Sequence, residues 1–229
     1  MEYNAKEFRT TLNNLVDEEY RLFVQKLGIG KLKPIGIRLP ELKTLAKELA
    51  KSNWQEFFER EKEDCPEVIM LKALVIGYAK TDFDTFAKYL IKVFDKVESW
   101  SEVDTCAANS KIIKKNREKT FELIYPFLFC KEEYKVRLAV IILMDHFLVD
   151  EWIDKVLELL PQIEQGVYYI DMGIAWTLSV CFVKFKDKTL KVFEQKKFSQ
   201  FVQNKAIQKC RESFRVSAED KELLKNYKI

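Results

Sequence analysis

The stretch Ser99-Trp100-Ser101-Glu102-Val103-Asp104 predicts a helix start and sets the pattern for the rest of the chain. Ser99 with Glu102 three residues later forms a capping box, so the helix begins here with Trp100 in its first turn. Asp104 lies four residues after Trp100 and therefore shares its helix face. An acidic residue near a helix N-terminus is also favoured by the helix dipole. From these residues alone, a capping role and a chemical role for Asp104 are equally open.

Apolar residues recur at helical spacing along most of the chain, and no segment shows convincing strand alternation. With only 6 Gly and 5 Pro among 229 residues, few tight turns interrupt the helices. Pro40, Pro66 and the capping residues Asn53 and Asp82 mark helix starts. We predict helices over residues 4–16, 18–28, 40–52, 54 onward, 66–80, 83 onward, 99 onward, 116–129, 131–148, 150–164, 167–184, 187–197, 199–212 and 217–226.

A succession of such helices joined by short links predicts an all-α fold. Antiparallel pairs stacked in order give an α-solenoid of HEAT-like, armadillo-type helical repeats, in which each repeat takes roughly 40 residues. The inner helices of such a stack line one concave face, here the helices starting near Ser99, Lys131 and Val167. No break in composition divides the chain, so residues 1–229 are expected to form a single HEAT-like repeat domain. A compact helical bundle is the alternative.

The composition excludes several classes of protein. The balance of 48% hydrophobic and 33% charged residues is that of a globular protein rather than a disordered one. The five cysteines include no CxxC pair, which indicates reduced thiols and a cytoplasmic protein. A single histidine, His146, argues against a histidine-rich metal site. No long apolar run predicts a membrane span, and neither a metal nor an organic cofactor is expected.

The formal net charge of +3 conceals an asymmetry. Residues 184–229 hold thirteen Lys or Arg against six Asp or Glu, a balance of +7, so the remaining residues sum to −4. A basic section on a weakly acidic body is typical of proteins that bind polyanions, although lysine-rich helix faces are often only solvated.

Two later helices carry polar or aromatic residues within otherwise apolar runs. Arg137 lies in Tyr134-Lys135-Val136-Arg137-Leu138-Ala139-Val140-Ile141, where an arginine either pairs with a carboxylate or meets an anion. Trp176 ends Tyr168-Tyr169-Ile170-Asp171-Met172-Gly173-Ile174-Ala175-Trp176, and its small neighbours allow close approach of another group. Taken alone, an isolated Trp is more often part of the core than of a binding site.

Taken together, these features resemble the AlkD-like DNA alkylation-repair family, which consists of HEAT-like-repeat alkylpurine DNA glycosylases. Trp100 with Asp104, then Arg137, then Trp176 occur in the family's order and at similar spacing. The similarity extends from Gly36-Ile37-Arg38-Leu39-Pro40 to residues 204–217 and covers most of the chain. The resemblance implies a concave groove for duplex DNA and release of cationic N3- or N7-alkylated purines. It also implies Asp104 as the catalytic carboxylate, Trp100 and Trp176 as aromatic walls, and Arg137 as an anchor for phosphate.

The residue types suit that chemistry. Alkylation makes the purine a good leaving group, so a carboxylate that stabilises the oxocarbenium charge on the sugar is the main requirement. Indole faces attract cations and exclude water. Duplex DNA, held by a monomer, is the expected partner through cations on the groove rim: Lys111, Lys114, Lys115, Lys205, Lys209, Arg211 and Arg215.

The chain also departs from the family's best-known glycosylases. Met172-Gly173 stands where a Lys-Ala pair is common, Ser179-Val180 where Arg-Glu is common, and Tyr134 where Trp is common. The segment before Gly36 is short and is similar to a branch lacking one helix that holds the lesion strand. A DNA-binding protein of the same family without efficient excision, and a protein-binding solenoid, are therefore kept as alternative functions.

Overall fold

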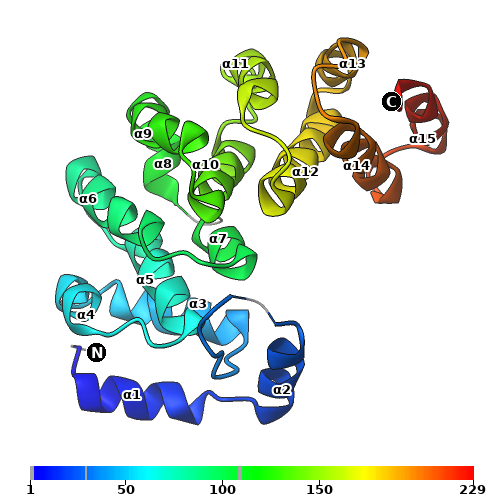
Figure 1. Cartoon of the computed structure of the whole chain (residues 1–229). Helices are drawn as coiled ribbons and strands as arrows, with labels where there is room; N and C mark the ends of the chain where they lie inside the picture. Colours follow the sequence, from blue (N-terminus) through cyan, green and yellow to red (C-terminus); the bar gives the residue numbers. More distant parts are fainter. Residues whose placement is uncertain (1–2, 29, 108–109) are drawn as a thin grey trace. The chain divides into compact units, whose positions relative to one another are not determined.

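The computed structural model describes residues 3–28, 30–107 and 110–229, and all regular structure within them is helical (Figure 1). The chain separates into two compact units, Met1–Thr120 and Phe121–Ile229. The α-helices are α1 (Ala5–Asn14), α2 (Glu18–Lys26), α3 (Leu39–Leu49), α4 (Trp54–Arg60), α5 (Pro66–Tyr78), α6 (Phe83–Phe94), α7 (Trp100–Ala107), α8 (Lys111–Lys115), α9 (Arg117–Ile124), α10 (Glu133–His146), α11 (Ile153–Leu159), α12 (Tyr168–Lys184), α13 (Lys186–Glu194), α14 (Gln200–Glu212) and α15 (Ala218–Leu223). Three 3₁₀ helices join them: η1 (Tyr125–Phe129), η2 (Leu160–Gln162) and η3 (Leu224–Tyr227).

Helix α5 is the centre of the first unit. It packs against α3, α6, α7 and α8, and nearly all of its residues from Pro66 to Ile76 are buried. A helix covered on several sides has no polar face to keep in water, which explains its almost uninterrupted apolar sequence. Pro66 opens it at the first helical position, where the missing N–H costs nothing.

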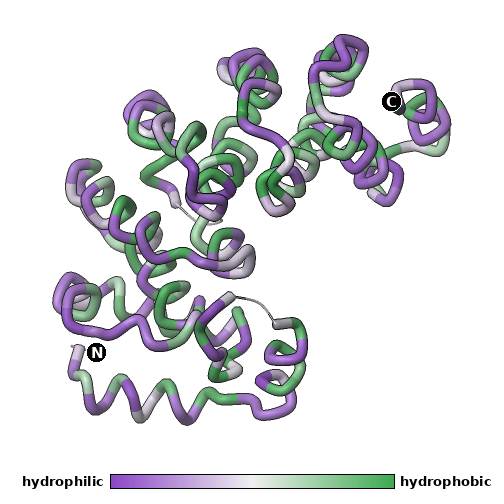
Figure 2. Tube along the Cα trace, in the orientation of Figure 1, coloured by the Kyte–Doolittle hydropathy of each residue, from purple (hydrophilic) through white to green (hydrophobic). Residues whose placement is uncertain are grey.

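Helix α12 is the centre of the second unit. It packs against α10, α13 and α14, while α11 packs against α13. Within this unit α10, α12 and α14 therefore follow one another in one layer, and α11 and α13 lie in another (Figure 1). Figure 2 shows the corresponding hydropathy, with apolar residues along most of α12 and hydrophilic residues toward the outer sides of α13 and α15.

The all-α prediction is confirmed. The expected helices are present, with ends that differ by a few residues because their last turns become loops or 3₁₀ helices such as η1 and η2. The two layers of the second unit are what stacked helical pairs produce, but the complete solenoid, its concave groove and the single domain over 1–229 stay predictions. No helix in the described part of the chain is both long enough and apolar enough to cross a membrane.

Candidate functional site

Trp100 and Asp104 line the same cavity, which has a volume of about 300 Å³. The cavity lies within the first unit, enclosed by α2, the segment before α3, α3 itself, α5 and α7. Its walls are mostly apolar, with a few polar groups that converge on the space. The lining residues are Tyr20, Val24, Pro34, Ile37, Leu39, Leu42, Lys43, Pro66, Glu67, Met70, Trp100, Ser101, Asp104 and Thr105.

The start of α7 determines how Trp100 and Asp104 are presented. The Glu102 N–H donates to Ser99 Oγ at 3.4 Å, and Glu102 Oε2 accepts from the Glu98 N–H at 2.7 Å. The reciprocal cap is thus present, although the carboxylate reaches one residue further back than a standard capping box. Burial raises the pKa of Glu102 above its usual range, against the lowering effect of the Glu98 N–H. Trp100 and Asp104, four residues apart, share the helix side that lines the cavity.

Helix α2 forms one wall of the cavity through Tyr20 and Val24. No α2 residue is buried, and polar and cation–π contacts join the start of this helix to the segment before α3. The Asp17 N–H donates to the Gly36 carbonyl at 2.9 Å, Arg38 Nε donates to Asp17 Oδ2 at 2.7 Å, and the Arg38 guanidinium lies 4.8 Å from the Tyr20 ring centroid. Both helices expected before Gly36 are present, and the second contributes to the cavity.

Glu67 adds a second carboxylate that the sequence analysis did not single out. It lies in the first turn of α5 with only 4% of its surface exposed. Its Oε1 accepts hydrogen bonds from the Ile35 N–H at 3.0 Å and the Gly36 N–H at 2.8 Å. Its Oε2 is buried and has no hydrogen-bond partner among the described residues. The available signal was a carboxylate directly after Pro66, at the head of an otherwise apolar helix.

Trp176 lines a separate cavity of about 270 Å³ within the second unit. This space lies between the C-terminal half of α12 and the end of α14 with the turn that follows it. Lys209 and Arg215 line it too, so three of the expected DNA-contacting residues share one site. The remaining lining residues are Ser179, Val180, Val183, Glu212 and Ser213, which include both positions where the family commonly has Arg-Glu. Trp176 is only partly buried and is not a core residue.

Arg137 lines neither cavity. It is 5% exposed, and its Nη1 donates to the Tyr169 carbonyl at 2.9 Å, joining α10 to the first turn of α12. A methyl group placed on Gly173 would lie 3.6 Å from Arg137 Cγ, an ordinary contact distance. Gly173, a small residue one turn before Trp176, is thus covered by the Arg137 side chain. The assignment of Arg137 to a phosphate stays a prediction.

The expected cationic residues form two groups. Lys111, Lys114 and Lys115 are exposed on α8 of the first unit. Lys205, Lys209, Arg211 and Arg215 lie on α14 or the following turn in the second unit, where the Lys205 ammonium donates to Gln208 Oε1 at 2.8 Å. Their contact with DNA stays a prediction.

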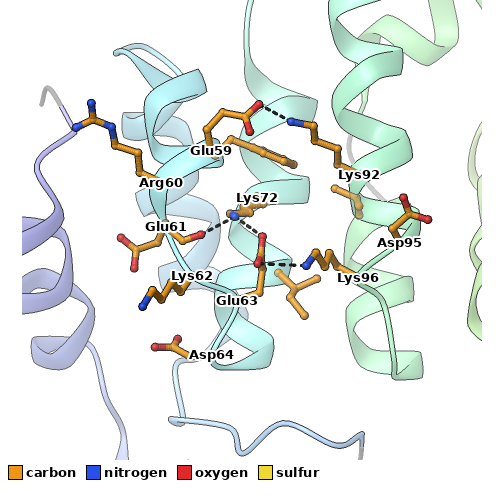
Figure 3. A pocket seen from close by; sticks show the side chains of 13 residues that line it. Glu59, Arg60, Glu61, Lys62, Glu63, Asp64, Lys72, Lys92, Asp95 and Lys96 are labelled. Atoms are coloured by element: carbon orange, nitrogen blue, oxygen red, sulfur yellow. Dashed lines mark hydrogen bonds and ion pairs between the residues drawn. The ribbon is translucent and has the colours of Figure 1, made fainter.

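A larger pocket of about 750 Å³ lies between the segment after α4, α5 and α6, and Figure 3 shows its lining side chains. Half of its charged side chains pair with one another. The buried Lys72 ammonium donates to the Glu61 carbonyl at 2.7 Å and pairs with Glu63, which also meets Lys96 at 3.6 Å. Lys92 pairs with Glu59 across the opening. These contacts link α4 and the segment after it to α5 and α6.

Comparison with known families gives one match. A family model described as DNA alkylation repair enzyme matches residues 8–208, most of the chain. The chain belongs to this family. Membership supports a general role in DNA alkylation repair and implies DNA as a partner. No curated protein and no solved structure gave a significant match. The matched range includes the whole Asp104 cavity and the α12 side of the Trp176 cavity. Of the residues expected from the family resemblance, Lys209, Arg211 and Arg215 lie just beyond it.

Proposed function

We propose that this protein is a DNA glycosylase that hydrolyses the N-glycosidic bond of cationic N3- or N7-alkylated purines in duplex DNA, with Asp104 as the catalytic carboxylate. The observation that carries the proposal is the cavity shared by Asp104 and Trp100 in a chain of the DNA alkylation repair family. The cavity pairs an aromatic face with a carboxylate, which are the two groups that a cationic nucleotide requires.

The alkylated purine leaves with the electron pair of the bond from C1′ and becomes neutral. Positive charge then develops on the deoxyribose, and a fixed carboxylate stabilises this charge more in the transition state than in the ground state. The Trp100 face attracts the cation and keeps water away from it. Because the leaving group needs no protonation, the chemistry requires no strong general acid.

DNA is held in this proposal by Trp176 and by two sets of cationic side chains, one on α8 and one on α14 with the turn after it. Lys209 and Arg215 beside Trp176 form a site with an aromatic wall and positive charge, which suits the sugar-phosphate backbone. Arg137 fixes the first turn of α12, and so it contributes to DNA binding by placing that helix.

Replacement of Asp104 tests the assignment. Asp104→Asn keeps the size and the hydrogen-bond acceptor but removes the negative charge. We expect release of N7-methylguanine or N3-methyladenine from methylated duplex DNA to fall about a hundredfold or more, while DNA affinity and melting temperature hardly change. The measurement is the amount of free base over time by chromatography.

Asp82→Asn is the matched control, since Asp82 caps α6 outside the cavity. This control should release bases at the wild-type rate. An Asp104→Asn variant as active as the wild type would reject the catalytic assignment.

A second candidate function is DNA binding without efficient excision. It is favoured by Ser179 and Val180, which line the Trp176 cavity in place of the charged pair common in the family. A wild-type chain that binds DNA but frees no base would select this function over the first.

A further inference from the structure

Four aromatic rings form a continuous row at the N-terminal ends of α10, α12 and α14, which lie side by side in the second unit (Figure 1). The rings are those of Tyr134 on α10, Tyr169 and Tyr168 on α12, and Phe201 on α14. Successive ring centroids in that order are 5.5, 5.1 and 6.2 Å apart. We call these four residues the aromatic row.

The aromatic row is open to solvent where α12 meets α14. Tyr168 is 57% exposed and Phe201 is 42% exposed, whereas the other two rings are half-buried. The core does not depend on the exposed pair, because buried residues such as Ile174 and Leu178 pack α12 into the unit. Two adjacent rings in water therefore leave an apolar surface that a partner could cover.

The backbone beneath the aromatic row is held by side chains. The Tyr169 N–H donates to Glu133 Oε1 at 2.8 Å, and the Tyr169 carbonyl accepts from Arg137 Nη1 at 2.9 Å. At the start of α14, the Val202 N–H donates to Ser199 Oγ at 3.2 Å. A surface whose backbone is fixed in advance loses little conformational freedom when a ligand binds, which favours affinity.

Positive charge lies beside the exposed rings. Lys205 is one turn after Phe201 on α14, and its ammonium lies 5.8 Å from the Phe201 ring centroid. The section of chain that contains both residues, 184–229, carries +7. Proteins that bind single-stranded nucleic acid combine these two features, because bases stack on the rings and cations follow the phosphates. A duplex keeps its base faces inside its own stack, so such rings need unpaired bases.

We propose that the aromatic row is a binding platform for single-stranded DNA, on which unpaired bases stack against Tyr168 and Phe201 while Lys205 meets a phosphate. Proline-rich peptides also dock on aromatic surfaces, but the basic section and the DNA alkylation repair family favour DNA. The inference goes beyond the proposed function, because it concerns unpaired bases and requires no base release.

Tyr168→Leu combined with Phe201→Leu tests the inference, since it removes both ring faces and keeps apolar side chains. Fluorescence anisotropy compares a labelled oligothymidylate of about 12 nucleotides with a duplex. Each base stacked on an aromatic ring contributes about 5- to 150-fold in affinity, so we expect oligothymidylate binding to weaken at least about tenfold. Duplex affinity should change by less than about twofold, because the paired bases do not reach the rings.

Two further readouts separate stacking from a change in charge or folding. The slope of log oligothymidylate affinity against log salt should stay at the wild-type value, because no cation is removed. The melting temperature should also stay, because both side chains are exposed. Tyr168→Phe combined with Phe201→Tyr keeps both rings and should bind oligothymidylate as the wild type does.

Tyr125→Leu combined with Phe129→Leu is the matched control. These two residues also present adjacent exposed rings in the second unit, each 44% exposed and with centroids 5.3 Å apart, but they lie on η1 outside the aromatic row. We expect this control to keep the wild-type affinity for oligothymidylate.

Wild-type affinity for oligothymidylate in the Tyr168→Leu, Phe201→Leu variant overturns the inference, and so does an equal loss in the η1 control or on the duplex. A wild-type chain that does not bind oligothymidylate also overturns it, and binding of a labelled oligoproline peptide in its place would assign the aromatic row to a protein partner. None of these measurements depends on base release. A wild-type chain that binds oligothymidylate through the row but frees no base therefore rejects the glycosylase function alone.

Discussion

At the scale of single residues, Gly36 holds the wall of the Asp104 cavity in place. Its φ is +90°, and a Cβ there would lie 2.4 Å from Arg21 Cβ and 2.8 Å from the Asp17 carbonyl oxygen. Its own N–H and carbonyl bind Glu67 and Asp17. We expect Gly36→Ala to destabilise the protein by about 2–3 kcal/mol, because backbone strain and overlap add. The measurement is the free energy of unfolding in urea.

Gly28→Ala is the control for this prediction. Gly28 also has positive φ, +61°, but no atom lies within 4 Å of a Cβ placed there. Only the conformational cost remains, about 1–2 kcal/mol. Equal losses for the two variants would show that the close approach of Arg21 to Gly36 contributes nothing.

The sequence was sufficient to predict the site residues that share one helix, but not those that tertiary packing brings together. Trp100 and Asp104 share a cavity because helix periodicity places residues four apart on one face, which any reader of the sequence can infer. Tyr20 and Glu67 join them only through tertiary packing across tens of residues. No local pattern encodes the distance between α2, α5 and α7, so these two were not predicted as site residues.

At the scale of elements, the N-terminal caps of α6 and α7 should respond to pH in opposite directions. Burial raises the pKa of Glu102, so the folded state holds that proton to higher pH than the unfolded state does. Glu102 therefore lowers the stability of the folded state as the pH rises above the pKa that Glu102 has in the unfolded state. Glu102→Gln should gain stability relative to the wild type as the pH rises above about 4, the usual range of an unfolded Glu. Urea midpoints at several pH values measure this difference.

Asp82, which caps α6, should show the opposite dependence of stability on pH. The Thr85 N–H, followed by the Thr85 hydroxyl, lowers its pKa. Its contribution is therefore present above the unfolded pKa and is lost as pH falls through the folded value. Asp82→Asn should be less stable than the wild type near neutral pH and approach it in acid. The same sign of pH dependence for both variants would contradict the assignment of these caps.

Helix periodicity and capping residues were enough to predict most elements but not their ends. Helix α8 was missed because it has only five residues and its cap, Ser110, makes no side-chain hydrogen bond to the backbone. The 116–129 helix ends as η1, where Pro126 follows Tyr125 and limits the preceding residue's backbone. Such details depend on contacts with α5 and α10, which sequence spacing does not report.

At the scale of the whole molecule, positive charge is concentrated in the C-terminal part of the chain. Residues 184–229 carry +7, whereas the chain as a whole carries +3. The exposed lysines of α8 add a second basic group on a body that is otherwise acidic. A distribution of this kind attracts a polyanion to chosen surfaces instead of to the whole protein, and it predicts strong dependence of DNA affinity on salt.

Replacing each basic group separately measures how much that group contributes to DNA binding. Each phosphate contact releases counterions, so removing one contact should reduce the slope of log affinity against log salt by about one. We expect Lys111→Gln, Lys114→Gln and Lys115→Gln combined to lower the slope by about three. Lys205→Gln, Lys209→Gln, Arg211→Gln and Arg215→Gln combined should lower it by up to about four. Fluorescence anisotropy with duplexes of several sequences measures both effects, and sequence preference should stay the same.

The controls are lysines of similar exposure that already pair with carboxylates. Lys188 binds Asp154 at 2.8 Å, and Lys225 pairs with Glu222. Replacing both by Gln removes as much formal charge per residue as the test variants do, so a change due only to net charge would appear here too. We expect the slope to stay near the wild-type value, because neither lysine belongs to the proposed contacts. An equal fall in slope for controls and test variants would mean that net charge governs binding. A fall for only one basic group would assign the DNA contacts to that group's unit alone.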